Sequence, residues 1–289
     1  MGTKIETLSR QAAHGGQIGT YRHASAATGT DMTFGLFAPP AALDGQHGPV
    51  PVLTWLAGLT CTHETFMIKA GALKRASELG LMLVAPDTSP RGEGVPDDPD
   101  GGWDFGLGAG FYLDATQAPW AEHYKMESYI TVDLQQAVFD NFAGNPAAQG
   151  IFGHSMGGHG ALTLGLRHPD LYKSISAFAP VCAPLQGPWG QKAFSNYLGE
   201  DQSHWAEHDA SRIMAGVPEA ASRPTILVDQ GLADEYLARE LYPERLEAAA
   251  EESGYPLQLR RHEGYDHGYY FIQSFINDHL AHHAAILRR

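Results

Sequence analysis

A serine flanked by glycines is the part of this sequence best suited to chemistry. Residues 153–157 have the pattern Gly-x-Ser-x-Gly, with Ser155 at the centre. An apolar segment precedes the pattern and a helical pattern follows it, which predicts a sharp strand-to-helix turn that exposes the serine hydroxyl. Glycine is required beside such a turn because a Cβ would collide with the neighbouring strand and helix. The pattern is typical of an acyl-transfer nucleophile; the alternative is a glycine-rich helix start with an incidental serine.

A serine hydroxyl needs a base to remove its proton and a carboxylate to orient that base. His267 lies between the last predicted strand and the last predicted helix, and Asp234 follows the exit of an earlier strand. Catalytic groups of a parallel sheet gather beyond the carboxyl ends of its strands, and the chain order Ser155, Asp234, His267 is one that a fold of this kind uses. We therefore predict His267 as the base and Asp234 as the orienting carboxylate.

Two other carboxylates compete with Asp234 for this role. Asp229 falls inside a predicted strand, so its side chain is expected to point into a face of the sheet. Asp266 adjoins His267 and is expected to hydrogen-bond to nearby backbone in its loop.

The oxyanion that forms during acyl transfer needs two backbone donors. We predict the N–H of Met156, directly after the nucleophile, and the N–H of Leu59, in the loop after the first buried strand. Cys61 lies near this loop, either as a thiol beside the pocket or as a buried structural cysteine.

The elements that must position these residues alternate between strand and helix. This order predicts an α/β fold with a mainly parallel, doubly wound sheet, in one domain over residues 1–289. Residues 1–48 are expected to supply edge strands at the N-terminus. Long segments at 88–110 and 184–199 are expected to be loops. The predicted strands are 30–38, 50–57, 81–87, 150–152, 174–181, 225–231 and 256–262; the predicted helices are 68–79, 129–142, 158–167, 239–253 and 269–287.

Composition excludes several classes of function. The 289-residue chain has a net charge of −14 and no basic stripe, which argues against nucleic-acid binding. Two cysteines make no disulfide framework or Cys-x-x-Cys metal motif. No apolar run has membrane-spanning length or resembles a secretory signal, so a cytoplasmic enzyme is expected. His279, His282 and His283 are interpreted as part of a solvated final helix, and no metal site is predicted.

Five separated motifs resemble S-formylglutathione hydrolase, also called esterase D. The resemblance extends over nearly the whole chain beyond the first thirty residues. Small departures occur, such as Tyr236 where a Phe is expected. The motifs are Trp55–Thr62, Ala85–Gly92, Gly108–Thr116, Gly153–Leu162 and Gly264–His267 with the following Tyr269–Ile272.

This resemblance implies an α/β-hydrolase fold, no cofactor, a cytoplasmic location and a homodimer. It also implies a thioester substrate, S-formylglutathione, which is cleaved to formate and glutathione through a formyl-serine intermediate. The family's catalytic serine, aspartate and histidine fall on Ser155, Asp234 and His267. Its oxyanion donors fall on Leu59 and Met156.

Substrate contacts are predicted on the long loops. Trp103, Tyr112 and Trp189 are candidates for the pocket walls, although aromatic residues there could equally pack in the core. Because glutathione carries two carboxylates, a local cation is expected to meet them within this acidic chain. The candidates are Lys192, Arg91 and Lys69.

Two rival interpretations remain open from the sequence. One is a general carboxylesterase for short-chain or aromatic esters that uses the same three residues. The other is a catalytically inactive binding module on the same fold, against which the intact Ser155, Asp234 and His267 argue.

Overall fold

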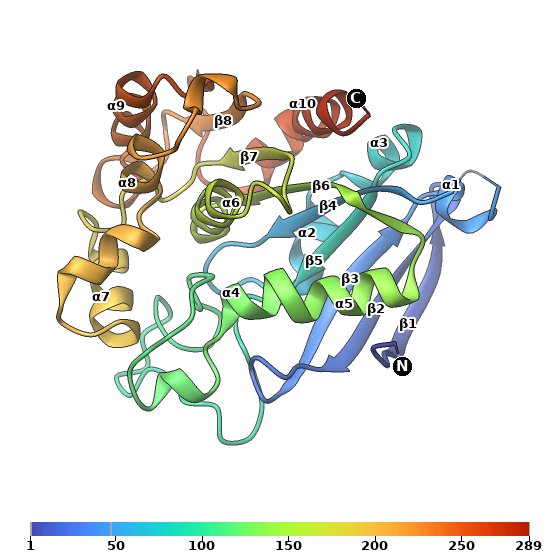
Figure 1. Cartoon of the computed structure of the whole chain (residues 1–289), viewed down its shortest axis with the longest axis horizontal. Helices are drawn as coiled ribbons and strands as arrows, with labels where there is room; N and C mark the ends of the chain where they lie inside the picture. The colour runs from blue at the N-terminus through green and yellow to red at the C-terminus, as the bar shows by residue number, and fades with distance from the viewer. Residues whose placement is uncertain (1, 47, 289) are drawn as a thin grey trace.

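Nine strands form one sheet in the computed structural model, which describes residues 2–46 and 48–288 (Figure 1). The first three strands and β5 pair antiparallel, and all later pairs are parallel. The prediction of a mainly parallel α/β sheet is confirmed. The order is β1 (Glu6–Ala13), β2 (Gly16–Ala24), β3 (Asp31–Ala38), β5 (Met82–Pro86), β4 (Val50–Leu56), β6 (Gly144–His154), β7 (Ser174–Phe178), β8 (Ile226–Gly231), β9 (Leu257–His262).

The N-terminal strands extend the sheet on one side. A tight turn joins β1 to β2 at His14 and Gly15, which both have positive φ. The strand predicted over 30–38 is β3, and it is antiparallel as expected. It is not the edge strand, because β2 and then β1 lie outside it.

Helices cover both faces of the sheet (Figure 1). On one face, α5 (Leu134–Asn141) packs on β6, and α6 (Met156–Arg167) packs on β4, β6 and β7. On the other face, α2 (His63–Lys69) packs on β3 and β5, α3 (Leu73–Glu78) on β5, and α10 (Tyr269–Leu287) on β6, β7 and β8. The remaining helices are α1 (Pro40–Leu43), α4 (Met126–Ser128), α7 (Pro188–Tyr197), α8 (Ala210–Ala215) and α9 (Pro243–Ser253).

Residues with positive φ explain why two of the predicted helices were too long. The helix predicted over 68–79 is two helices, α2 and α3, because Gly71 between them has φ +68°. The helix predicted over 239–253 is a π-helical turn, Leu237–Leu241, followed by α9. Tyr242 has φ 50° at the junction, and Pro243 then begins α9. Proline is tolerated there because an N–H at the first position of a helix has no intrahelical acceptor.

One predicted loop is partly a helix. Residues 184–199 contain α7, so the prediction of a loop there was wrong. Pro188 occupies the first turn of α7, and the buried Trp189, Ala193 and Tyr197 recur at helical spacing. Pro184 and Gly187 precede the helix, Pro188 and Gly190 lie in its first turn, and Gly199 follows it. This helix carries one wall of the candidate site described below.

Of the three histidines of α10, His279 and His283 are buried and His282 is half-buried, which corrects their interpretation as part of a solvated helix. His279 Nδ1 lies 2.8 Å from Ser176 Oγ, and His283 lies 2.6 Å from Ser174 Oγ through Nδ1. Burial lowers the pKa of both histidines, so both act as neutral hydrogen-bonding groups. They attach α10 to β7 through a polar network inside the sheet–helix interface.

Asp229 extends this network to β9. Its carboxylate accepts two hydrogen bonds of 2.6 Å from Arg260 and lies 3.1 Å from His279 Nε2. Burial opposes ionisation of Asp229, but the hydrogen bonds from Arg260 and His279 outweigh it and hold its pKa below the usual value. Asp229 therefore points into a face of the sheet, as predicted, and serves its packing.

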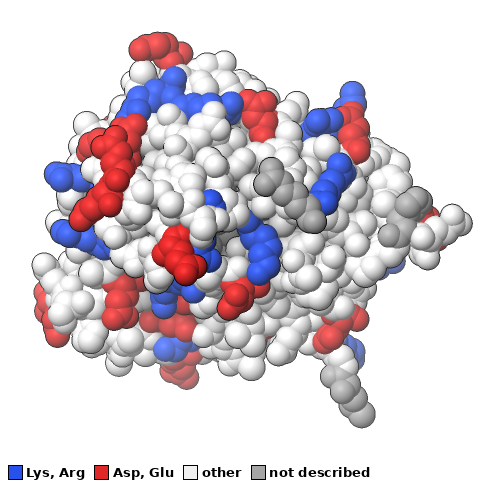
Figure 2. All heavy atoms as spheres, turned by 45° about the horizontal axis from the view of Figure 1, so that its top comes forward, with Lys and Arg blue, Asp and Glu red and all other residues white. Residues whose placement is uncertain are grey.

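The surface charges are mixed. On the face drawn in Figure 2, Lys and Arg side chains alternate with Asp and Glu side chains over the surface. In the described residues, none of the helices has both the length and the hydropathy required to cross a bilayer.

Candidate active site

Ser155 stands at a sharp turn between β6 and α6. Its backbone has φ 58° and ψ −122°, a conformation that L-residues rarely adopt, and neighbouring strands hold it there. Its N–H donates to Phe178 O at 3.0 Å, and its carbonyl accepts from Val181 N at 3.2 Å. The sharp strand-to-helix turn at Ser155 is the one that the sequence pattern predicted, and Ser155 lines a cavity there.

The glycines of this turn are required by close backbone approach. A Cβ on Gly157 would lie 2.0 Å from Leu56 O, and a Cβ on Gly153 would lie 2.3 Å from Gly157 O. Neither contact can be relieved by a side-chain movement, because both involve main chain. The glycines therefore let β4, β6 and α6 meet closely enough to place Ser155 beside the loop after β4.

His267 and Asp234 meet at the carboxyl end of the sheet. His267 Nδ1 lies 2.5 Å from Asp234 Oδ2. The Asp234 side chain is fully buried, and it also accepts from Tyr236 N at 2.9 Å and from Gln230 Nε2 at 3.3 Å. Three donors therefore fix the carboxylate. The contact leaves His267 Nε2 as the ring nitrogen available to a substrate or a nucleophile.

Ser155 and His267 line the same cavity of about 180 Å³. The part of the chain that the structure describes shows no hydrogen bond between them. Nucleophile–base contacts are often longer before a substrate binds and tighten in the complex. The cavity is lined by Gly58, Leu59, Thr60, Cys61, Trp103, His154, Ser155, Trp189, Tyr236, His267 and Tyr269.

The two backbone amides predicted as oxyanion donors lie in different elements, and of these two residues Leu59 lines the cavity. Met156 is the first residue of α6, where a helix leaves its N–H groups without intrahelical acceptors. Leu59 lies in the loop after β4, and the next two amides are occupied, since Thr60 donates to Gly108 O and Cys61 donates to Gly58 O. Within residues 2–46 and 48–288, no acceptor takes the Leu59 N–H.

Of the three aromatic residues predicted to line the pocket, two line the cavity and one does not. Trp189 of α7 and Trp103 of the loop after β5 both line the cavity, with ring centroids 5.6 Å apart. Tyr112 does not line it. That side chain is 1% exposed, donates to Ala57 O at 2.8 Å and packs against Gly160, so it belongs to the core.

The three predicted cations differ in whether a carboxylate of the protein already pairs with them. Lys192 donates to Asp98 at 2.8 Å and to Asp104 at 2.6 Å, so its charge is compensated within the protein. Arg91 is paired with both oxygens of Asp87. Lys69 has no carboxylate partner among the described residues, and its ammonium lies 5.9 Å from the ring centroid of Tyr269, a cavity residue.

Tyr236 and Tyr269 of the cavity were not predicted as site residues, and His154, which flanks Ser155, was expected to pack rather than to shape the turn. Tyr236 has its ring 4.9 Å from His267 and 4.8 Å from Trp189. His154 has its ring 4.4 Å from His267, and Tyr269 begins α10. The available signal was proximity in sequence, because each lies within two residues of Asp234, Ser155 or His267. Cys61 lines the cavity, and burial raises the pKa of its thiol, which favours the protonated form.

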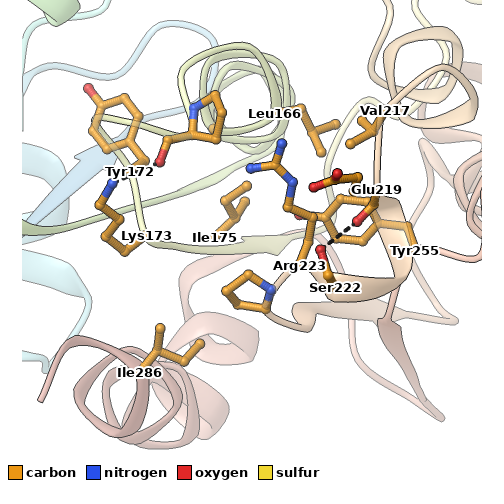
Figure 3. Close-up of a pocket in the computed structure, with 13 residues that line it drawn as sticks. Leu166, Tyr172, Lys173, Ile175, Val217, Glu219, Ser222, Arg223, Tyr255 and Ile286 are labelled. Atoms are coloured by element: carbon orange, nitrogen blue, oxygen red, sulfur yellow. Dashed lines mark hydrogen bonds between the residues drawn. The ribbon is translucent and has the colours of Figure 1, made fainter. Parts of the chain in front are cut away.

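A second hollow lies at the opposite, amino ends of β7 and β8 (Figure 3). It has a volume of about 390 Å³, with Leu166 and Ile175 on its floor and Arg223 and Lys173 beside it. None of the site residues predicted from the sequence lines this hollow. The candidate active site is therefore the smaller cavity around Ser155.

Known proteins resemble this chain over most of its length. The family model described as "Putative esterase" matches residues 25–282. S-formylglutathione hydrolase of Paracoccus denitrificans is 50% identical over 279 residues, 96% of this chain and 97% of that protein. The Bos taurus protein of the same name is 47% identical over 98% of this chain and 99% of its own length.

A solved structure is equally similar. The S-formylglutathione hydrolase of Agrobacterium tumefaciens superposes with a TM-score of 0.93 at 46% identity, covering 98% of this chain and 99% of that chain. Because these matches extend over nearly the full length, and sequence and structure agree on one family, the chain belongs to the S-formylglutathione hydrolase family.

Proposed function

We propose that this protein hydrolyses the thioester S-formylglutathione to formate and glutathione, with Ser155 as nucleophile, His267 as general base and Asp234 as its orienting carboxylate. The observation that carries the proposal is the 2.5 Å contact between His267 Nδ1 and Asp234 Oδ2 beside the strained Ser155, in a chain of this family. No metal or cofactor takes part in the proposed reaction.

In the acylation step, Ser155 Oγ attacks the formyl carbon and His267 Nε2 takes the hydroxyl proton. The Asp234 carboxylate stabilises the imidazolium that forms. The carbonyl oxygen becomes negative and accepts hydrogen bonds from the N–H groups of Leu59 and Met156. The carbon–sulfur bond then breaks, the proton on His267 passes to the departing sulfur, glutathione leaves as the thiol, and a formyl ester remains on Ser155 beside a neutral His267.

In the deacylation step, a water molecule replaces glutathione beside His267. The imidazole takes a proton from this water, whose oxygen attacks the formyl carbon through the same oxyanion site. The ester bond to Ser155 breaks and its oxygen recovers the proton from His267. Formate leaves, and the enzyme returns to its starting state.

The shape of the cavity suits a small acyl group. Trp103, Trp189 and Tyr236 surround about 180 Å³ next to Ser155, and formyl is the smallest acyl group. A thiolate is also a better leaving group than an alkoxide, so the same machinery is expected to favour the thioester over simple esters.

Steady-state kinetics on two substrates test this proposal. We expect kcat/KM for S-formylglutathione to exceed that for p-nitrophenyl acetate by at least tenfold, because only the thioester combines the small acyl group with glutathione contacts. A clear preference for the acetate ester would instead support the rival carboxylesterase, which shares the same three residues.

Lys69 is the cation that we propose for a glutathione carboxylate. Its charge is not compensated by a carboxylate of the described chain, whereas Lys192 already binds Asp98 and Asp104. Lys69→Ala is expected to raise KM for S-formylglutathione about threefold to tenfold and to leave kinetics on p-nitrophenyl acetate unchanged, since an exposed charge contact is worth about 1 kcal/mol.

Lys192→Ala is the matched control. Because its loss removes a contact between α7 and the loop after β5, it should lower stability and affect both substrates alike. Equal effects of Lys69→Ala on the thioester and on the uncharged ester would contradict a role for Lys69 in glutathione binding.

Three further features complete the proposal. One sheet passing through strands from residue 6 to residue 262 supports a single domain. The family resemblance supports a cytoplasmic location and a homodimer, and neither nucleic acid nor membrane is proposed as a partner. The mass of the particle in solution, measured by light scattering, tests the dimer.

A further inference from the structure

His154 has polar atoms that the mechanism above does not use. It ends β6 directly before Ser155, is 6% exposed and lines the same cavity. Neither of its ring nitrogens has a hydrogen-bond partner among the described residues. A neutral imidazole offers one donor and one acceptor, and burying both without partners opposes folding. His23 also has two unpartnered ring nitrogens, and what distinguishes His154 is its place in the lining of the cavity.

The surroundings of His154 connect it to the proposed base. The centroids of the His154 and His267 rings are 4.4 Å apart, with their planes at 47°. The Tyr269 ring lies at 6.2 Å on α10. A Cβ on Gly58 would lie 3.3 Å from His154 Nδ1, so the ring also touches the loop that carries Leu59. His154 therefore packs between the base and the oxyanion loop.

The charge state of His154 follows from its burial. Burial, and secondly the nearby His267, lower its pKa well below the usual value. It remains neutral when His267 takes a proton. The other titratable groups that face this pair are Asp234 from the loop after β8, Tyr236 from the same loop, Tyr269 from α10 and Cys61 from the loop after β4.

We propose that His154 is a positioning residue, whose neutral ring packs against His267, fixes the orientation of its imidazole and stabilises the imidazolium that forms when Ser155 loses its proton. A cation within about 6 Å of an aromatic centroid can be attracted to the ring, and the centroids of His154 and His267 are 4.4 Å apart with their planes tilted by 47°. The proposal rests on the proposed serine-hydrolase mechanism but not on the identity of the acyl group.

The test is the pH dependence of kcat/KM for p-nitrophenyl acetate, whose acid limb follows protonation of His267. His154→Leu removes the ring face, so the midpoint of this limb should move to lower pH by about half a unit, and the plateau should fall about threefold. His154→Phe keeps a ring face, and its acid limb should stay within about 0.2 units of that of the wild type.

His159→Leu is the matched control. His159 is also a buried histidine with an unpartnered Nδ1, and burial lowers its pKa to about 3, but it packs against Phe111 and Phe194 outside the cavity. Its variant should keep the wild-type acid limb. If His154→Leu does not fold, His154→Gln, which also lacks a ring, should shift the limb in the same direction.

An unmoved acid limb in the folded ringless variant, or an equal shift in His159→Leu, would overturn the proposal. Because the test uses p-nitrophenyl acetate, it also separates this inference from the proposal that S-formylglutathione is the substrate. A wild-type protein that cleaves the ester but not S-formylglutathione contradicts the proposed substrate and still tests His154. A wild-type protein that cleaves neither contradicts both.

Discussion

Ser155→Ala is expected to lower kcat for S-formylglutathione by a factor on the order of 10⁴ to 10⁶, with little change in KM. In the proposed mechanism the hydroxyl oxygen bonds to the formyl carbon, and alanine offers no group that replaces it at the strained turn between β6 and α6. The binding surfaces remain, because Ser155 contributes only one small side chain to the cavity. Steady-state kinetics at high enzyme concentration measure the residual rate.

Ser274→Ala is a suitable control for this substitution. Ser274 lies on an exposed turn of α10, where its hydroxyl donates only to Tyr270 O, so the variant should keep wild-type kinetics. A fluorophosphonate probe should label the wild type and Ser274→Ala but not Ser155→Ala. A wild-type protein that the probe fails to label would favour the inactive binding module over the hydrolase.

Asp234→Asn is expected to lower kcat about 10⁴-fold near neutral pH. The carboxylate lies 2.5 Å from His267 Nδ1 and holds the proton on that nitrogen, which leaves Nε2 free to accept from Ser155. An amide presents its NH₂ group or its oxygen with equal ease, so it permits the wrong tautomer and provides no charge for the imidazolium. The pH profile of kcat/KM and the rate at its plateau measure the loss.

Asp266→Asn separates this effect from a general loss of loop charge. Asp266 adjoins His267, is exposed, and accepts from Gly268 N at 2.9 Å, a contact that an asparagine oxygen can keep. Its variant should retain activity within about threefold of the wild type. If Asp266→Asn lost as much activity as Asp234→Asn, the assignment of the orienting carboxylate would be wrong.

Local patterns in the sequence were sufficient for much of the fold. The apolar run at 50–57 predicted β4 (Val50–Leu56), and the pattern at 269–287 predicted α10 (Tyr269–Leu287) with its observed ends. These predictions succeed because backbone periodicity and chain reversals are properties of a few adjacent residues. The helix in 184–199 was missed because its prolines and glycines suggested a loop while its buried face has meaning only against the core.

Part of the candidate site could also be predicted from local patterns in the sequence. Ser155, Asp234 and His267 each follow a predicted strand, and parallel strands bring their carboxyl ends to one edge of the sheet. Tyr112 and Lys192 were expected in the pocket, but Tyr112 is in the core and Lys192 is paired with Asp98 and Asp104. Neither the burial of Tyr112 nor the ion pairing of Lys192 can be recognised from the residues that adjoin them in the sequence.

The sequence by itself determined the alternation of the main strands and helices, the sharp turn at Ser155 and the family. Only the tertiary structure decided which cation stays uncompensated, which aromatic side chains reach the cavity, and that His154 lies against His267. The physical reason is that backbone conformation depends on neighbours along the chain. Burial, charge pairing and ring contacts depend instead on segments that lie tens or hundreds of residues apart and meet only when the chain folds.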